Sequence, residues 1–354
     1  MGSDRLAPGG RIGILGGGQL GRMLALAAAR LGLRVHVYEP GADPCAAPVV
    51  ERVVRAPWDD AAALADFAAG VDVVTYEFEN VDLAAVDVLA ELKPMLPGRR
   101  ALEVAQDRLA EKSFLSGLGL VVAPHRAVDG PEALAEALEA LGPAILKTRR
   151  FGYDGKGQVR LAPGDDAAAA WAAIGGQPAV LEGLIEFERE ISVVAVRGID
   201  GAVAAFDPGE NLHRDGILHT TTVPAAISAG QGQDAVLLAG RILNALDYVG
   251  VIGVEMFVTR EGLIVNEIAP RVHNSGHWTQ DACLTDQFEQ HVRAIARWPL
   301  GDGRRHSDAV MTNLIGDEVH AAPAEAGVAV HIYGKAEARP QRKMGHVTRI
   351  APRS

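Results

Sequence analysis

In the first hundred residues, short runs of β-branched and aromatic residues alternate with longer stretches rich in Ala and Leu. The short runs have the length of buried strands, and the longer stretches have the length of helices. In chain order these segments are Arg11–Leu15, Gln19–Leu31, Arg34–Tyr38, Ala61–Ala69, Val71–Phe78 and Leu83–Leu92. Strands and helices that alternate in this way are typical of βαβ units with a parallel sheet. The chain is therefore predicted to begin with a Rossmann-like α/β domain.

The length of 354 residues predicts further domains, because one hydrophobic core stops growing at roughly 250–300 residues. Pro94 and Pro97-Gly98 end the first region, and a helix is expected from about Ala101 to Ser116. We place the first boundary at Gln106. The expected organisation is a Rossmann-like domain at 1–106, an α+β domain at 107–300 with a small lid at about 123–186, and a C-terminal subdomain at 301–354.

Alternation of apolar and polar residues after the first domain predicts hairpins in a mostly antiparallel sheet. The expected strands are Ala144–Lys147 and Ala179–Ile185 in the lid, followed by Ile191–Val196, Ala202–Phe206, Val251–Val258, Leu263–Ile268, Ala309–Ile315 and Val328–Tyr333. The expected helices are Ala167–Ala173, Asp234–Leu246 and Asp281–Ala296.

Composition excludes several classes of protein. A net charge of −11 argues against binding nucleic acid, which needs a basic surface. No run approaches the roughly 20 apolar residues of a membrane span, and no signal peptide is recognisable, so we expect a cytoplasmic protein without a membrane segment. The two cysteines, Cys45 and Cys283, have no CxxC or Cys/His spacing, which argues against a disulfide framework or a structural zinc site.

The segment Gly16–Gly21 fits the pattern GxGxxG between a strand and a helix, where small residues let a phosphate approach the helix N-terminus. Glu39, at the end of the second expected strand, lies near the usual ribose-binding position of nicotinamide dehydrogenases. A tight turn that needs glycine for packing explains the segment equally well.

A second glycine-rich loop, Gly152–Gln158, lies between two lid strands and could cover a triphosphate with its backbone amides. A plain hairpin turn is the alternative. Lys147 supports the phosphate interpretation, because a lysine in an otherwise apolar strand needs an anionic partner.

The hairpin formed by Val254–Val258 and Leu263–Glu267 carries the clearest chemistry. Glu255 and Glu267 can be neighbours across the two strands, with Asn266 beside them. Two such carboxylates would repel each other unless a cation lies between them, and Mg²⁺ prefers oxygen ligands together with nucleotide phosphates. An outward-facing polar row is the alternative.

Two further segments concentrate polar side chains. Arg271–Gln280 follows the hairpin directly and is typical of a reaction centre, although His277 can equally be structural. Arg271 could hold bicarbonate or a phosphoryl oxygen. Arg339–Lys343 concentrates positive charge in an acidic protein and is either a phosphate-binding pocket or a solvated run of charges.

Taken together, these motifs resemble the ATP-grasp superfamily and, within it, the family of 5-(carboxyamino)imidazole ribonucleotide synthetases of bacterial purine biosynthesis. The segments that carry the resemblance span most of the chain: Gly17–Met23, Thr75–Asn80, Gly152–Gln158, Glu210–His213, Asn266-Glu267 and Arg271–Gln280. The resemblance implies a pre-ATP-grasp Rossmann-like domain, a lid and a larger central domain. It also implies an ATP- and Mg-dependent ligase that carboxylates aminoimidazole ribonucleotide with bicarbonate through carboxyphosphate, and it suggests a homodimer. Members of the family usually continue beyond Gly345-His346 with another strand and helix, so we expect the C-terminal subdomain to be shortened or atypical.

The resemblance also implies roles for individual residues. The ATP contacts would be Arg108, Lys147, Gly152, Tyr153, Asp154, Gly155, Lys156, Gly157, Gln158, Glu182, Gly183, Leu184, Ile185, Glu190, His213, Asn266 and Glu267. The magnesium ligands would be Glu255 and Glu267. The ribonucleotide would meet Gly18, Gln19, Leu20, Glu77, Tyr153, Asp154, His273, Arg339, Arg342 and Lys343. The catalytic residues would be Lys147, Arg271, His273 and Asn274, with His273 as a proton shuttle or carboxyphosphate ligand because an unperturbed pKa near 6.5 suits proton transfer.

Other interpretations remain open on sequence grounds. Another ATP-grasp enzyme, such as a formate-using purine transformylase or an amino-acid ligase, would share the ATP residues but not the Arg271–Gln280 segment. A nicotinamide dehydrogenase would explain only Gly16–Gly21 and Glu39. A non-catalytic nucleotide-binding module would leave the metal and phosphate groups without a role.

Overall fold

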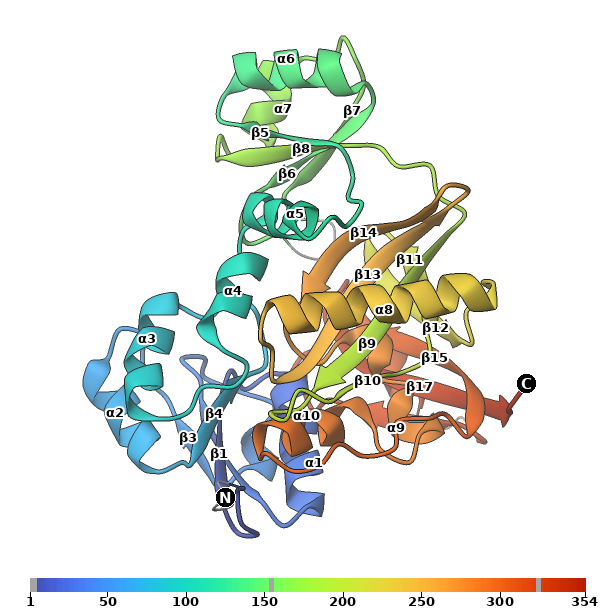
Figure 1. Ribbon diagram of the computed structural model, residues 1–354. Coiled ribbons are helices and arrows are strands. Elements are labelled where there is room, and N and C mark those ends of the chain that lie inside the picture. The colour runs from blue at the N-terminus through green and yellow to red at the C-terminus, as the bar shows by residue number, and fades with distance from the viewer. Residues whose placement is uncertain (1–4, 153–155, 323–325) are drawn as a thin grey trace.

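The structure is a computed structural model that describes residues 5–152, 156–322 and 326–354. The described strands form three sheets of four, nine and four strands. Figure 1 shows the small sheet and its helices at the top, the N-terminal sheet at the lower left and the large sheet to the right. Within the described residues, no helix has the length and apolar character needed to cross a bilayer.

The N-terminal sheet is parallel throughout, with strand order β3-β2-β1-β4. Strand β1 is buried along Ile12–Leu15, as expected for a strand covered on both faces. This confirms the prediction of a Rossmann-like α/β unit. The elements are β1 (Arg11–Leu15), α1 (Gln19–Arg30), β2 (Arg34–Tyr38), η1 (Ala47–Val49), β3 (Arg52–Val54), α2 (Ala61–Ala69), β4 (Val73–Tyr76), α3 (Leu83–Leu92) and α4 (Arg99–Ala105).

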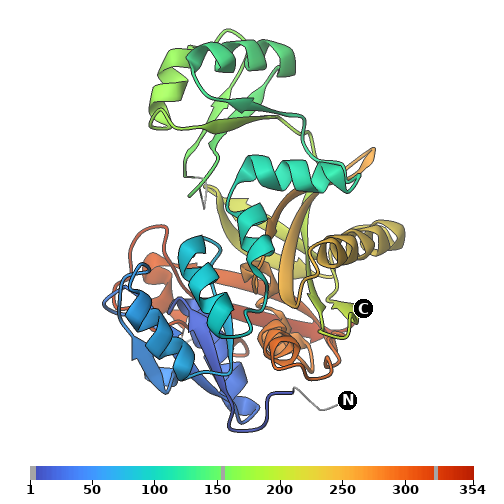
Figure 2. The ribbon, with the colours of Figure 1, turned by 60° about the vertical axis from the view of Figure 1, so that its left-hand side comes forward.

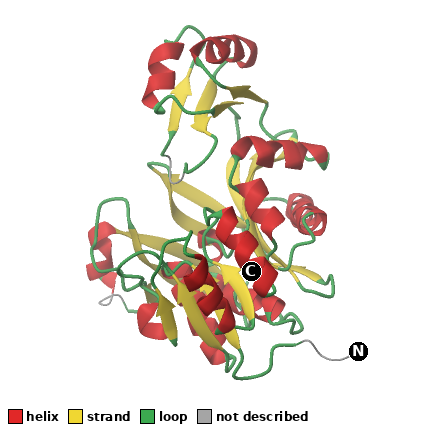
Figure 3. Ribbon diagram, turned by 90° about the vertical axis from the view of Figure 1, so that its left-hand side faces the viewer, coloured by secondary structure: helices red, strands yellow, loops and turns green. Residues whose placement is uncertain are grey.

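The lid is an antiparallel sheet of order β5-β8-β6-β7 with two helices on one face, which Figure 3 shows as a separate two-layer body. Its apolar core, which includes Leu134, Leu146 and Leu181, is built from lid residues alone. The elements are β5 (His125–Val128), α6 (Pro131–Leu141), β6 (Ala144–Thr148), β7 (Gln158–Leu161), α7 (Ala167–Ala173) and β8 (Ala179–Gly183). The second glycine loop thus joins β6 to β7, as predicted.

The large sheet is antiparallel, with order β14-β13-β9-β11-β12-β15-β17-β16 and with β10 paired to β9. Helix α8 packs against β9, β13 and β14, whereas α10 packs against β9, β13 and α1. Strands β15 to β17 therefore extend the same sheet that carries the predicted metal hairpin. The elements are α5 (Arg108–Gly117), β9 (Arg189–Arg197), β10 (Val203–Ala205), β11 (Gly209–Arg214), β12 (Ile217–Val223), α8 (Ala229–Ala245), β13 (Gly250–Thr259), β14 (Gly262–Ala269), η2 (Asn274–Gly276), α9 (Thr279–Ala282), α10 (Gln287–Ile295), β15 (Ser307–Ile315), η3 (Gly316–His320), β16 (Ala329–Ile332) and β17 (Lys343–Pro352).

Two predicted helices are each split in the structure. The helix expected from Ala101 to Ser116 is α4 followed by α5, because the Asp107 carboxylate accepts hydrogen bonds from Leu109 N at 3.0 Å and Ala110 N at 3.4 Å and so starts a new helix. The helix expected over Asp281–Ala296 is α9 followed by α10, and Asp286 caps α10 in the same way. The prediction of single helices was wrong at both places.

Candidate active site

A cavity of about 980 Å³ lies where the N-terminal sheet, the lid and the large sheet meet. Figure 2 shows α5 between the lid and the large sheet at this junction. The cavity walls include most of the predicted site residues: Gln19, Leu20, Glu77, Arg108, Lys147, Gly152, Lys156, Gln158, Glu190, His213, Glu255, Asn266, Glu267, Arg271, His273, Asn274, Arg339, Arg342 and Lys343.

Six described residues among the predicted site residues are not part of the cavity wall. The described residues that do not line the cavity are Gly18, Gly157, Glu182, Gly183, Leu184 and Ile185. Tyr153, Asp154 and Gly155, predicted to contact ATP and, for the first two, the ribonucleotide, lie outside the described residues.

The two predicted metal ligands face each other in the sheet. Glu255 on β13 is directly opposite Glu267 on β14, as the alternation of the hairpin predicts. Burial raises the pKa of Glu255 to about 7, and the neighbouring Glu267 adds to the shift. Burial opposes ionisation of Glu267 as well, but Arg108, with Nη1 3.0 Å from Oε2, lowers the pKa of that carboxyl to about 2. A divalent cation would relieve this repulsion, so the donor set fits Mg²⁺.

Two lysines meet one carboxylate beside the metal pair. Lys147 Nζ on β6 is 3.0 Å from Glu182 Oε2 on β8, and Lys112 Nζ on α5 is 3.4 Å from the same oxygen. Lys112 also donates a 2.5 Å hydrogen bond to the carbonyl of Asn266. Burial opposes ionisation of Glu182, yet the two ammonium groups lower its pKa. Glu182, which is also predicted to contact ATP, pairs with both lysines in this structure.

Lys112 is a site residue that the sequence motifs do not identify. Its side chain is only 1% exposed, whereas the neighbouring charges on α5 are typical of a solvated helix face. The interpretation changes only when the fold places α5 against β14.

His213 and Glu190 form a second charged pair on the cavity wall. They lie on the adjacent strands β11 and β9, and His213 Nδ1 is 2.5 Å from Glu190 Oε2. Burial opposes the charge on His213, but Glu190 raises the pKa of the imidazole above its ordinary value. The two predicted ATP contacts are therefore brought together by strand pairing.

Carboxylates of the chain itself bind the amides of the first glycine loop. Glu77 accepts hydrogen bonds from Gly18 N at 2.7 Å and Gly21 N at 2.9 Å, and Glu39 accepts one from Gly17 N at 2.8 Å. These are the amides that a dinucleotide pyrophosphate would use. With two acidic side chains at that position, the loop does not suit an NAD pyrophosphate. Glu77 is buried, which raises its pKa.

Arg271 makes a bidentate ion pair with Glu79, which the sequence analysis had not assigned a role. Nη2 of Arg271 is 3.0 Å from Glu79 Oε1, and Nε contacts the other carboxylate oxygen. Both residues line the cavity, so a guanidinium of fixed orientation faces it.

His273 is held on several sides. Its Nδ1 is 2.8 Å from Ser275 Oγ, and its Nε2 is 3.3 Å from Glu255 Oε1. Gln287, which is fully buried, accepts a 2.8 Å hydrogen bond from His273 N and donates one of 2.8 Å to His273 O. Burial lowers the pKa of His273 to about 3, with Arg271 contributing, so the unperturbed value near 6.5 expected from sequence does not hold here.

His277 has the structural role that was one of its two interpretations. It is fully buried, its Nδ1 is 3.0 Å from Gln287 Nε2, and its ring packs on Phe288 and His346. Asn274 does line the cavity, and its side-chain amide exchanges two hydrogen bonds with that of Asn313, at 2.9 and 2.7 Å.

Three residues of the basic segment near the C-terminus, Arg339, Arg342 and Lys343, line the same cavity as Glu77 and Lys147. Lys335 also lines this cavity, although the sequence analysis missed it. Its Nζ donates a 2.7 Å hydrogen bond to the carbonyl of Lys343, and burial together with Arg342 lowers its pKa to about 8. Arg342 in turn donates a 3.0 Å hydrogen bond to the carbonyl of Glu337. This cluster is suited to a phosphate group.

Comparison with known families gives three adjoining matches. A ribonucleotide synthetase preATP-grasp domain matches residues 10–106, an ATP-grasp domain matches 113–288, and a phosphoribosylaminoimidazole carboxylase C-terminal domain matches 309–354. Among individual proteins, the N5-carboxyaminoimidazole ribonucleotide synthase of Brucella melitensis is 57% identical over the full length of both chains. That of Bacillus subtilis is 40% identical, with 98% of this chain and 93% of the relative covered.

Solved structures of the same kind superpose closely. The ADP complex of an N5-carboxyaminoimidazole ribonucleotide synthetase gives a TM-score of 0.94 at 41% identity, covering 98% of this chain and 94% of the other. The Aspergillus clavatus enzyme, solved with ADP and 5-aminoimidazole ribonucleotide, gives 0.91 at 32% identity, covering 98% and 95%. The Glu255/Glu267 pair, the lysines beside it and the basic wall thus lie in a chain that belongs to the N5-carboxyaminoimidazole ribonucleotide synthase family of ATP-grasp enzymes.

Proposed function

We propose that this protein is an ATP-dependent ligase that carboxylates 5-aminoimidazole ribonucleotide with bicarbonate in purine biosynthesis, releasing ADP and phosphate. One observation carries the proposal. One cavity is lined by Glu255, Glu267 and Lys147, here called the nucleotide wall, and by Glu77, Lys335, Arg339, Arg342 and Lys343, here called the substrate wall. The first wall suits a nucleotide triphosphate, and the second suits the phosphate of a ribonucleotide.

On the nucleotide wall, Glu255 and Glu267 would hold Mg²⁺, which would neutralise charge on the transferring phosphoryl group. Lys147, which is paired with Glu182 in this structure, would weaken that ion pair in order to contact the phosphates. Arg108 already faces both Glu267 and the glycine loop, with Nη2 3.3 Å from the carbonyl of Gly152. His213 and Glu190 would orient the nucleotide, together with the remaining predicted ATP contacts Lys156, Gly157, Gln158, Gly183, Leu184, Ile185 and Asn266.

Between the walls, Arg271, His273 and Asn274 would hold the one-carbon unit. A bicarbonate oxygen attacks the γ-phosphorus of ATP, the bond to ADP breaks, and carboxyphosphate forms. The exocyclic amine of the ribonucleotide then attacks the carboxyl carbon, the amine loses a proton and phosphate leaves. The departing phosphate takes up that proton as HPO4²⁻. His273, which its lowered pKa keeps neutral, would hold the carboxyl group by hydrogen bonding, and the fixed Arg271 guanidinium would stabilise the oxyanions.

On the substrate wall, Arg339, Arg342, Lys343 and Lys335 would bind the ribonucleotide phosphate, and Gln19, Leu20 and Glu77 would contact its other groups. Three further points are predictions of the same proposal: a division into residues 1–106, 107–300 and 301–354, a homodimer, and a cytoplasmic location.

The decisive experiment is phosphate release from Mg-ATP with and without aminoimidazole ribonucleotide and bicarbonate. We expect release that needs both compounds, because neither alone completes the reaction. Formate and amino acids serve as alternative acids in parallel assays. Release that depends on one of these, and not on bicarbonate, would replace the proposed substrate with that of another ATP-grasp enzyme.

A further inference from the structure

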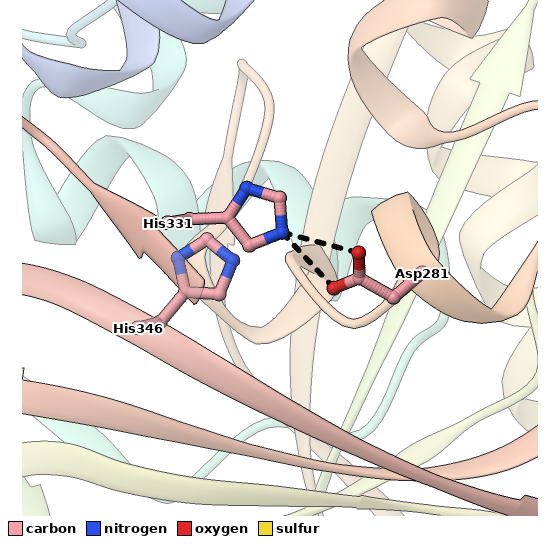
Figure 4. Close-up of side chains that lie close together, drawn as sticks. All are labelled: Asp281, His331 and His346. Atoms are coloured by element: carbon pink, nitrogen blue, oxygen red, sulfur yellow. Dashed lines mark hydrogen bonds and ion pairs between the residues drawn. The ribbon is translucent and has the colours of Figure 1, made fainter. Parts of the chain in front are cut away.

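A cluster of two histidines and one aspartate lies outside the cavity described above. Asp281, His331 and His346 each offer one ligand atom, and these three atoms lie within 4.8 Å of one another. None of the three lines the cavity. Figure 4 shows the two imidazole rings side by side, with a ring nitrogen of His331 pointing at the Asp281 carboxylate.

The fold itself brings these side chains together. His331 on β16 and His346 on β17 are direct partners in the antiparallel register, and their rings stack with centroids 4.5 Å apart. Asp281 comes from α9, and both its carboxylate oxygens lie 3.1 Å from His331 Nε2. Three separate elements therefore contribute one group each.

One ring nitrogen in this cluster has no partner among the described residues. His346 is fully buried, and its Nε2 makes no hydrogen bond to any of them. Its Nδ1 is 2.9 Å from the hydroxyl oxygen of Tyr333. If Nδ1 carries the ring proton and donates a hydrogen bond to this oxygen, Nε2 keeps its lone pair. A metal-binding histidine is usually fixed in this way, with its other nitrogen bonded to a neighbouring polar group. An unpaired buried nitrogen is otherwise costly.

We propose that Asp281, His331 and His346 form a binding site for a single Zn²⁺ ion, distinct from the magnesium pair. Two imidazoles and one carboxylate, with water in the fourth position, are a common donor set for zinc. Bonds of about 2.0–2.1 Å at tetrahedral angles separate ligand atoms by about 3.3 Å, close to the 3.1 Å between His331 and Asp281. From a separation of up to 4.8 Å, the widest pair must approach by about 1.5 Å. Because the planes of the two stacked imidazoles are only 11° apart, one ring must also tilt so that both lone pairs meet the same ion.

A zinc ion could reach this site from solvent, and its binding would fix the position of a nearby loop. The side chains of His331 and Asp281 are 27% and 16% exposed, so the site opens towards solvent. His331 and His346 stand at the two ends of the loop that carries Lys335 and the basic segment Arg339–Lys343. Zinc would therefore fasten the base of this loop to α9, whose first two residues, Thr279 and Gln280, end the Arg271–Gln280 segment. Only this consequence, and not zinc binding itself, rests on the proposed function.

The test uses the full chain without an affinity tag, stripped of metal by a chelator and titrated calorimetrically with Zn²⁺ in excess Mg²⁺. We expect one zinc per chain and a rise in melting temperature on binding. Asp281→Asn and His331→Gln should each weaken zinc binding at least tenfold. Asp281→Asn preserves the shape of the side chain and so guards against misfolding.

His320→Gln is the matched control, because His320 is a well-exposed histidine on η3 near the same strands. It should bind zinc as the unaltered protein does. Less than one zinc per chain, or equal affinity in Asp281→Asn, His331→Gln and the unaltered protein, would overturn the proposal. Loss of zinc only on substitution of Glu255 would assign the ion to the acidic pair and overturn it equally. Ribonucleotide KM, compared with and without zinc, tests the effect on the loop separately.

Discussion

Replacing Gln287 should lower activity far more than an equivalent replacement three residues away on the same helix. Gln287 holds both backbone polar groups of His273, and Gln290 holds both backbone polar groups of Gly301, at 2.7 and 3.0 Å. Both glutamines are fully buried. Gln287→Met and Gln290→Met keep the side-chain length, and each removes a pair of hydrogen bonds to the backbone. Gln287→Met also removes the contact with His277 Nδ1, and only it releases a proposed catalytic residue.

The magnitude follows from the unpaired groups. Each buried polar group left without a partner costs about 1–3 kcal/mol, so the two backbone groups cost about 2–6 kcal/mol in either variant, and His277 Nδ1 adds about 1–3 kcal/mol in Gln287→Met. Displacement of His273 that raises the barrier by about 1.4 kcal/mol lowers kcat tenfold. This increase in the barrier is smaller than the lowest cost of the unpaired groups, about 2 kcal/mol. We therefore expect at least a tenfold loss of kcat in Gln287→Met and less than a twofold loss in Gln290→Met.

The assay is ADP release with aminoimidazole ribonucleotide and bicarbonate, at a temperature where circular dichroism shows both variants folded. The melting temperature should fall in both variants, and at least as far in Gln287→Met, because that variant loses one more buried hydrogen bond. If Gln287→Met retained its kcat, or if both variants lost kcat equally, the idea that Gln287 positions His273 would have to be abandoned.

Three further predictions concern the same cavity. Gly276→Ala should lower kcat in steady-state assays, because the added Cβ would lie 2.8 Å from Gln287 Oε1; an unchanged kcat would contradict this. The Mg²⁺ affinity of the protein should fall as pH drops from 8 to 6, because protonation of Glu255, whose pKa is about 7, competes with the metal. Calorimetric titration across this range should show the change, and a flat profile would exclude Glu255 as a ligand. Lys112→Met should lower the melting temperature, at a cost of about 1–3 kcal/mol, because the carbonyl of Asn266 loses its donor, and should raise the KM for ATP more than it changes kcat.

The elements whose residues alternate regularly were predictable from sequence. The Glu255/Glu267 pairing follows from two strands joined by a short turn, which leaves little freedom in register. The parallel N-terminal sheet follows from alternating strand and helix patterns. The helix breaks at Asp107 and Asp286 could have been predicted, because each aspartate is a good N-cap residue and precedes a helical stretch. The continuous apolar periodicity across each break instead favoured a single helix.

The unpredicted site residues share a different cause. Lys112 and Glu79 are charged residues whose partners lie far away in sequence, so nothing local distinguishes them from surface charges. Lys335 bonds the carbonyl of Lys343 across a loop, and its burial depends on how that loop folds back. Glu77 was predicted as a substrate contact, yet its bonds to Gly18 and Gly21 depend on the arrangement of β4 beside β1. Burial by tertiary contacts changes both the hydrogen-bond partners and the pKa of a side chain. The residues next to it in the sequence do not reveal that burial.

The separate apolar core of the lid has a thermodynamic consequence. Among the described residues, the lid meets α5 largely through polar contacts, such as Arg149 with Asp107 at 2.6 Å and Lys112 with Glu182. Swinging the lid away from α5 would therefore break ion pairs but expose little hydrocarbon. The heat capacity of such an opening would be small, because that quantity follows apolar exposure, whereas its equilibrium would respond to ionic strength. The enthalpy of lid opening would thus depend little on temperature, and the salt concentration would shift the equilibrium between the open and closed lid.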